Sequence, residues 1–278
     1  MLPDFASVIP ESKEDALAYL SSLKSAKIFA GGTDLLVKMR RGESYSHIVD
    51  ITGIRDIKVI SDHGEMINIG AVSTHHEISV NQIISEKALS LAKACGWVGS
   101  PAIRNMGTIG GNLVNASPAA DSLAPLLIHD ADVVLESKDG TRRKRLEDFI
   151  LAPYKTDIQP HEILTFITIK GLPGYREGYK RVTKRAAWAI SRLSIAWAIQ
   201  EKGGFYKDVK LAIGSCTPMP FRPRKVEDSL KDRAKDEKTI QVAVGEIIDE
   251  IIKVSGMRPS FVYKIPVVKA LLEDILKG

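Results

Sequence analysis

Two short glycine stretches carry the groups whose type and spacing indicate anion binding. The first, AGGTD, runs from Ala30 to Asp34, and the second, TIGGN, runs from Thr108 to Asn112. Glycine reaches positive φ without strain and leaves neighbouring amides uncovered. Consecutive amides in that conformation form a concave anion-binding nest. One such stretch alone is more often a tight turn after a strand, but two favour a grip on both sides of an extended diphosphate.

Polar neighbours of the glycines add possible ligands. The hydroxyls of Thr33 and Thr108 can donate to phosphate oxygens. Asp121 follows SPAA in an expected loop, where it either accepts hydrogen bonds from ribose or ribityl hydroxyls or caps a helix over SLAPLL. The first stretch lacks the G-x-G-x-x-G spacing of dinucleotide folds and the Gly-Lys-Ser/Thr ending of a P-loop. The residues alone therefore predict a two-nest binder of an anionic cofactor.

Composition narrows the class of protein. The chain has 278 residues, 44% apolar and 26% charged, which is ordinary for one large or two smaller globular domains. Its net charge is +5, and its densest basic cluster is RRKR, Arg142 to Arg145. That cluster is either a nucleic-acid site or a solvated strand edge, and the lack of interleaved aromatic residues favours the edge. We therefore expect no nucleic-acid partner.

Cysteine content and apolar runs give expectations about compartment. Cys95 and Cys216 are the two cysteines, too few to ligate an iron–sulfur cluster or a structural zinc by themselves. No run is long enough for a transmembrane segment, and no signal peptide is evident. These features predict a cytoplasmic protein.

The order of periodic segments predicts three parts. A helix over ESKEDALAYLSSL, with Ser12 as its N-cap, lies between short strands at AKIF and HIVD. The middle part alternates at MINIGA, is helical at ISEKALSLAKAC and forms a hairpin around Asp139-Gly140. This middle part is expected to be antiparallel and α+β.

The last part follows a stretch rich in glycine and proline. KGLPGYREG, from Lys170 to Gly178, is the predicted linker. Beyond it, AISRLSIAWAIQ and DVKLAIGS predict an antiparallel sheet, and two helices cover it, the second from Val267 to Leu276.

Motif order along nearly the whole chain adds a family resemblance. FAGGTDLLVKMRRG and RNMGTIGGNLVNASPAADSLAPLL closely resemble the flavoprotein (medium) subunit of the molybdenum hydroxylases, a group that includes carbon monoxide, xanthine and nicotinate dehydrogenases. Each motif is only moderately specific, whereas their order and spacing are highly specific. The resemblance implies a PCMH-type (vanillyl-alcohol-oxidase-like) FAD-binding fold of two subdomains, residues 1–57 and 58–172. A C-terminal α/β domain over 177–278, with an antiparallel sheet and helices, follows.

The resemblance also implies which residues bind FAD. The two glycine motifs clasp the diphosphate, and further contacts come from the Asp after SPAA, the Leu of EIL and the Tyr-Lys pair that opens the third domain. A positive charge at Lys180 would stabilise reduced, anionic flavin; the alternative is a surface lysine. Carried over, the site is Ala30, Gly31, Gly32, Thr33, Asp34, Thr108, Ile109, Gly110, Gly111, Asn112, Asp121, Leu164, Tyr179 and Lys180.

The implied function is electron transfer within a heterotrimer. A large molybdopterin-binding subunit hydroxylates the substrate, and a small [2Fe–2S] subunit passes electrons to FAD. NAD, a quinone, oxygen or a ferredoxin is the external acceptor. No catalytic acid or base and no metal site are expected in this chain. The 4-hydroxybenzoyl-CoA reductase version carries a cysteine-ligated cluster that this chain lacks the cysteines to bind.

Two alternatives remain open from the residues. One is a stand-alone PCMH-type flavin oxidoreductase with its own small substrate, and the other is a non-catalytic assembly protein. His75 and His76 are interpreted as structural, because no metal-ligand set accompanies them. Trp97, Trp188 and Trp197 are interpreted as core or interface residues rather than flavin stackers.

Overall fold

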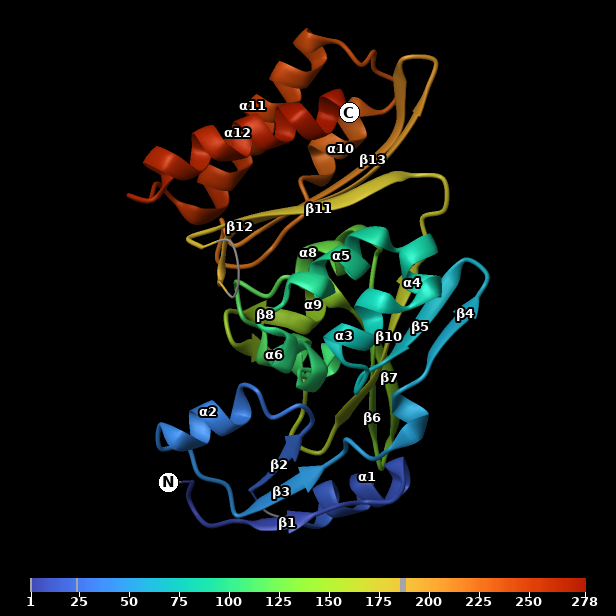
Figure 1. The fold of residues 1–278 in the computed structure, drawn as a ribbon, viewed down its shortest axis with the longest axis vertical. Coiled ribbons are helices and arrows are strands. Elements are labelled where there is room, and N and C mark those ends of the chain that lie inside the picture. Colours follow the sequence, from blue (N-terminus) through green and yellow to red (C-terminus); the bar gives the residue numbers. More distant parts are fainter. Residues whose placement is uncertain (1, 24, 186–188) are drawn as a thin grey trace.

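A computed structural model describes residues 2–23, 25–185 and 189–278. Three of the four sheets in the described residues follow one another along the long axis of the molecule, from the N-terminal blue end to the C-terminal red end (Figure 1). The fourth is a two-stranded sheet over residues 150–156 of the middle part. The sheets fall in the three stretches of sequence expected to form separate parts, although the last begins at Arg176. Trp188 lies outside the described residues.

The N-terminal sheet is parallel. Its order is β1 (Ala6–Val8), β3 (His47–Asp50) and β2 (Ala26–Phe29). Helix α1 (Lys13–Ser22) returns the chain from β1, and the Ser12 hydroxyl accepts a hydrogen bond from the Asp15 amide as expected for its N-cap. The loop after β2 leads into the short helix α2 (Leu35–Arg40).

The middle sheet is antiparallel, as predicted. Its order is β4 (Ile60–His63), β5 (Met66–Gly70), β10 (Ile163–Lys170), β6 (Asp132–Ser137) and β7 (Gly140–Arg145). The basic cluster lies on β7, which is an edge strand of this sheet. The strand-edge interpretation is therefore confirmed.

Short helices cover this sheet. Buried side chains from them and from β5, β6 and β10 form the largest apolar core of the molecule. The N-terminal part ends with η1 (Arg55–Ile57). The remaining elements of the middle part are α3 (His75–Val80), α4 (Gln82–Lys87), α5 (Leu89–Trp97), α6 (Pro101–Met106), α7 (Ile109–Asn115), α8 (Leu123–Ile128), α9 (Leu146–Phe149), β8 (Ile150–Ala152) and β9 (Lys155–Thr156).

The C-terminal sheet is buried on both faces. It consists of β11 (Arg176–Thr183), β12 (Ser191–Lys202) and β13 (Phe205–Gly214), all antiparallel. Leu193, Ile195 and Ile199 pack against the C-terminal helices, whereas the small Ala196 and Ala198 belong to the middle core. Small side chains on that face let α5 and α8 approach the sheet closely (Figure 1).

Three helices close the chain, and one boundary differs from the expectation. They are α10 (Arg224–Leu230), α11 (Glu237–Ser255) and α12 (Phe261–Lys277). The start predicted at Val267 is wrong, because α12 continues through Pro266. Proline removes the amide that would bond to the Val262 carbonyl. Val262 is exposed, so water can solvate that carbonyl.

Candidate flavin site

A cavity of about 600 Å³ lies between the N-terminal sheet and the middle part. Its wall includes both glycine motifs, the start of α7 and residues 158–164 before and within β10. Of the fourteen residues carried over from the resemblance, ten line it: Ala30, Gly31, Gly32, Thr33, Asp34, Thr108, Gly110, Gly111, Asn112 and Leu164. Segments far apart in the sequence therefore meet in one hollow of the size typical of cofactor sites.

The first glycine motif has the free amides that the predicted nest requires. The amides of Gly31, Gly32, Thr33 and Asp34 donate to no acceptor among the described residues. Gly32 has φ of +68°, which a side chain would disfavour. Four uncommitted donors in succession on a cavity wall can bind an anionic group supplied from outside the chain.

Gly31 has a second role, which is packing. A Cβ at this position would lie 2.0 Å from the carbonyl oxygen of Met106. The first motif therefore rests directly on the end of α6, just before the second motif begins.

The second motif corrects the two-nest expectation. Thr108 caps α7, with its hydroxyl accepting a 3.1 Å hydrogen bond from Gly111. The amides of Ile109 and Gly110 donate to the carbonyls of Ser73 and Ala71, and the Asn112 amide donates to Thr108. All four amides are already used within the chain, so this motif has no free backbone nest.

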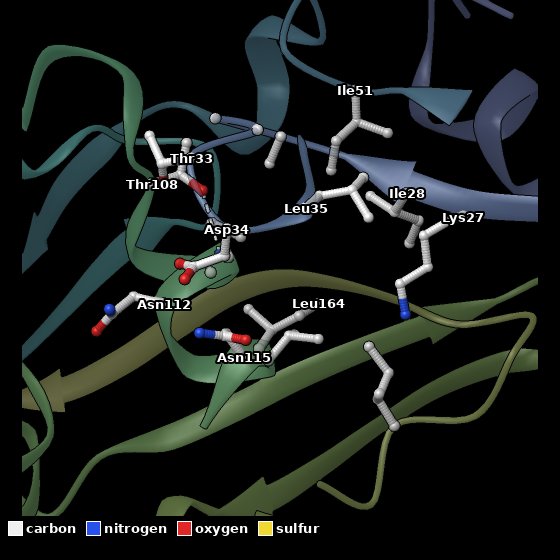
Figure 2. Close-up of a pocket in the computed structure, with 18 of the residues that line it drawn as sticks. Lys27, Ile28, Thr33, Asp34, Leu35, Ile51, Thr108, Asn112, Asn115 and Leu164 are labelled. Carbon is white, nitrogen blue, oxygen red and sulfur yellow. Dashed lines mark hydrogen bonds between the residues drawn. The ribbon is translucent and has the colours of Figure 1, made fainter. Parts of the chain in front are cut away.

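The second motif contributes side chains to the cavity wall, and its glycines allow close packing. Gly110 lets α7 rest on Ala71, because a Cβ there would lie 2.7 Å from the Ala71 carbonyl oxygen. Thr33 and Thr108 lie where the two motifs meet, and Asn112 and Asn115 project from α7 below them (Figure 2). Ile109 is fully buried in the core and does not line the cavity.

Charged and apolar groups divide the rest of the cavity. Lys38 donates a 2.8 Å hydrogen bond to Asn115. Ile28, Leu35 and Ile51 form an apolar wall at the end away from the threonines (Figure 2). Lys27 lies over the ring of Tyr45 at this end, with its nitrogen 5.7 Å from the centroid. The cavity thus combines an anion site with a long apolar wall, which fits a dinucleotide such as FAD.

Asp121 and Tyr179 meet each other outside this cavity. Asp121 accepts hydrogen bonds from Tyr179 at 2.6 Å, Arg181 at 2.8 Å and Ser191 at 2.5 Å. Burial raises the pKa of the Asp121 carboxyl, although these three donors favour its charged form. The alternative that Asp121 caps α8 is wrong, because its carboxylate bonds to the C-terminal sheet and the N-cap residue is Ser122.

Lys180 points to the other face of β11. Successive strand residues face opposite sides of a sheet, and Lys180 pairs with Asp274 on α12 while its neighbours contact Asp121. Its amine also lies 5.9 Å from the centroid of Trp197. The structure therefore does not bring Asp121, Tyr179 and Lys180 to the cavity wall, and their contact with flavin stays a prediction.

Arg181 and His75 make or line structural features that the sequence did not predict. Arg181 is buried against Asp121 and lies 5.0 Å from the ring of Trp97, which is half exposed rather than in the core. His75 is buried and lines the cavity, whereas His76 is exposed. The sequence placed His75 at the start of a capped helix. Structural histidines often occupy that position, so the sequence offered no reason to assign His75 to the cavity.

The basic cluster of β7 is partly neutralised. Arg142 contacts Asp157 at 2.7 Å and Glu162 at 2.6 Å, and Lys144 contacts Asp157 at 2.6 Å. These pairs fix the loop of residues 157–162, which borders the cavity. Among the described residues, no helix has the length and apolar character needed to cross a membrane.

A row of free amides on a cavity of cofactor size is typical of a dinucleotide-binding protein, and comparisons with known proteins identify the class as a flavoprotein. Residues 3–169 match the family described as the FAD binding domain in molybdopterin dehydrogenase, and residues 178–277 match the CO dehydrogenase flavoprotein C-terminal domain. The chain belongs to this family of FAD-binding medium subunits of molybdenum hydroxylases, which are oxidoreductases.

Individual relatives are similar over their full length. The glyceraldehyde dehydrogenase medium chain of Sulfolobus acidocaldarius is 32% identical, with 99% of this chain and 98% of that one covered. The nicotinate dehydrogenase FAD-subunit of Eubacterium barkeri is 31% identical, covering 99% and 97%. A reconstituted CO dehydrogenase from Oligotropha carboxidovorans has a TM-score of 0.90 at 26% identity, covering 99% and 96%.

Proposed function

We propose that this chain carries the FAD that receives electrons from [2Fe–2S] clusters of a small partner subunit and delivers them to an external acceptor. A large molybdopterin-binding subunit would hydroxylate the substrate and complete the heterotrimer. The observation that carries the proposal is the row of four uncommitted amides, Gly31 to Asp34, on a cavity wall that a second motif closes.

The chain's own residues would hold the cofactor by three kinds of contact. The amides of Gly31 to Asp34 bind the diphosphate, since a nest of oriented amides favours anions. The hydroxyls of Thr33 and Thr108 and the amide of Asn112 add side-chain hydrogen bonds from both motifs. Leu164, with Ile28 and Ile51, packs against the flat apolar surface of the cofactor and keeps water away from it.

The chemistry comes from the cofactor, and the protein positions it. When bound, FAD accepts electrons one at a time and releases two. No acid or base of this chain is needed for simple electron transfer. The names of the relatives support the assembly: they are medium chains or FAD-subunits of dehydrogenases. NAD, a quinone, oxygen and a ferredoxin are the candidate acceptors.

We also propose the domain limits 1–57, 58–172 and 177–278. The cavity then lies between the first two, and the third packs on α5 and α8 of the second. In this arrangement Asp121 on the second domain and Tyr179 on the third stabilise the support of the flavin site.

The electron route is tested on the assembled complex with and without flavin. Gly111 is exposed on the cavity wall, so Gly111→Val fills cavity space and yields a complex lacking FAD. The clusters are reduced with dithionite, excess reductant is removed, and each acceptor is added in turn. We expect cluster reoxidation, followed by electron paramagnetic resonance, to be fast with wild-type chain and slow with Gly111→Val. Equal rates would contradict the route.

A further inference from the structure

His75 is a buried polar side chain that makes no side-chain hydrogen bond among the residues the structure describes. It is the first residue of α3, a helix capped by Thr74 and Glu77, and its side chain is almost completely buried at 2% exposure. The backbone amide donates to the Gly107 carbonyl at 3.0 Å. Within the described part of the chain, neither ring nitrogen makes a hydrogen bond, and Nδ1 is fully enclosed.

This ring lies between the two glycine motifs. A Cβ built on Gly107 would be 3.4 Å from His75 Cδ2 and 3.5 Å from the hydroxyl oxygen of Thr33. Thr33 belongs to the first motif, and Gly107 directly precedes the second. His75 also lines the cavity, so its side chain belongs to the wall where the motifs converge.

The ring is neutral and suited to one hydrogen bond of either kind. Burial, with the charge of Arg104, lowers its pKa to about 4. A neutral imidazole has one donor nitrogen and one acceptor nitrogen. Leaving such a group unpaired in a protein interior is unfavourable, and no contact within the described residues compensates for it.

We propose that His75 is a cofactor-positioning residue whose Nε2, the ring nitrogen that is not enclosed, hydrogen-bonds an oxygen in the diphosphate–ribityl segment of FAD. Four amides of the second motif, Ile109 to Asn112, already donate within the chain, so this side of the cavity has no row of free backbone donors. His75 provides the donor that Gly110 and Gly111 cannot. The inference rests on the proposed FAD site and extends it to a residue outside both glycine motifs.

The first test measures FAD affinity of the full-length apoprotein by flavin fluorescence quenching. His75→Phe keeps a ring but removes both nitrogens, and His76→Phe is the matched control on the exposed neighbour. Because one hydrogen bond contributes about 0.5–1.5 kcal/mol, we expect His75→Phe to weaken FAD binding about threefold to tenfold. The control should bind FAD as the wild type does.

A second readout separates cofactor binding from folding. Removing a buried unpaired polar group should leave the melting temperature of the apoprotein unchanged or raise it, while FAD should stabilise His75→Phe less than the wild type. A structural role would lower the apoprotein melting temperature instead. ADP, which keeps the diphosphate but lacks the ribityl chain, locates the contact. If His75→Phe also binds ADP more weakly than the wild type, the contact lies at the diphosphate. If only its affinity for FAD falls, the contact lies at the ribityl chain.

Nitrogen NMR of the wild type needs no variant that could fail to fold. With nitrogen-15-labelled histidine, FAD should shift the His75 ring signals and leave those of His76 in place. Unchanged His75 signals, or equal FAD affinity of His75→Phe, would overturn this inference alone. A wild-type chain that binds no FAD would instead overturn the proposed function.

Discussion

Gly31 and Gly111 are the same residue type under different constraints. At Gly31 the space for a side chain is taken by the Met106 carbonyl, which belongs to the protein. At Gly111 the nearest atom is the Thr108 hydroxyl oxygen at 2.9 Å, and the residue is otherwise exposed on the cavity wall. Gly31 lets the first motif rest on the end of α6, whereas Gly111 faces the cavity that we propose for the cofactor.

Gly31→Ala should therefore damage the fold as well as the site. Its Cβ would meet backbone that cannot rotate away, which forces the first motif off α6. Overpacking of this kind costs about 1–3 kcal/mol. Thermal unfolding of the apoprotein measures it, with Gly53→Ala as the control because a Cβ at Gly53 would meet nothing within 4 Å. Similar melting temperatures for the two variants would contradict this packing role.

Asp121 should contribute to stability through Arg181. Asp121→Asn keeps a shape able to accept from Tyr179 and Ser191 but leaves the buried guanidinium without a countercharge. Breaking a buried pair in this way costs about 3–5 kcal/mol. Denaturant unfolding should show that loss, whereas Asp274→Asn, which breaks the exposed pair with Lys180, should change little. A small effect at Asp121 would mean that its hydrogen bonds suffice without the charge.

At the residue scale, the sequence located the free amides of the first motif. It did not show that the second motif uses its amides for hydrogen bonds within the chain. AGGTD and TIGGN look alike as letters, but Ser73 and Ala71 accept the amides of the second motif only after the chain has folded. His75 was interpreted as structural for the same reason. Its missing partner is a property of the surrounding structure, and a single sequence contains no record of it.

Glu177 on β11 joins two layers at the element scale. Its carboxylate accepts hydrogen bonds from Leu89 and Ser90 at the start of α5 and contacts His129 at 2.7 Å. Burial opposes ionisation of Glu177, but the hydrogen bond and charge of His129, together with Ser90, lower its pKa. The C-terminal sheet is thereby fixed to the helices of the middle part.

Glu177→Gln should remove a pH-dependent part of the stability. A carboxyl with a lowered folded-state pKa stabilises the fold above its unfolded value, about 4.3, and this contribution is lost as pH falls through the folded value. We expect the variant to be about 1–3 kcal/mol less stable at neutral pH. The difference should shrink below about pH 4. Urea unfolding at several pH values measures it, and a difference independent of pH would contradict the assignment.

Element types were predictable, and boundaries were less so. The Asp139-Gly140 turn predicted the β6–β7 hairpin. Hydrophobic periodicity predicted the β12 and β13 strands and the first of the two C-terminal helices, which is α11. Gly178 was assigned to a linker, yet it lies within β11. A Cβ there would come within 2.3 Å of the Trp197 ring, so this glycine serves cross-strand packing rather than a turn. Glycine in a sequence does not reveal which of these roles it has.

At the scale of the whole molecule, the cavity proposed for flavin lies between the N-terminal part and the middle part, and neither part could form it alone. The loop between β2 and α2 supplies the free amides, and the middle part supplies the platform beneath them. The C-terminal sheet is packed on the far side of that platform (Figure 1). Motif order in the sequence predicted this arrangement through resemblance, since periodicity alone does not say which sheets lie together.

FAD retention tests the central claim, that the cofactor lies between the two glycine motifs. FAD is added to the full-length chain, excess is removed, and visible absorption is recorded. Gly111→Val directs its side chain into the cavity and displaces at most the Thr108 cap, about 1 kcal/mol. Gly245→Val is the matched control, an exposed helical glycine on α11 with nothing within 4 Å of its Cβ position.

The account predicts flavin bands in the wild type and in Gly245→Val, and their loss in Gly111→Val with a fold unchanged by circular dichroism. Flavin bands retained by Gly111→Val, or absent from the wild type, would contradict it.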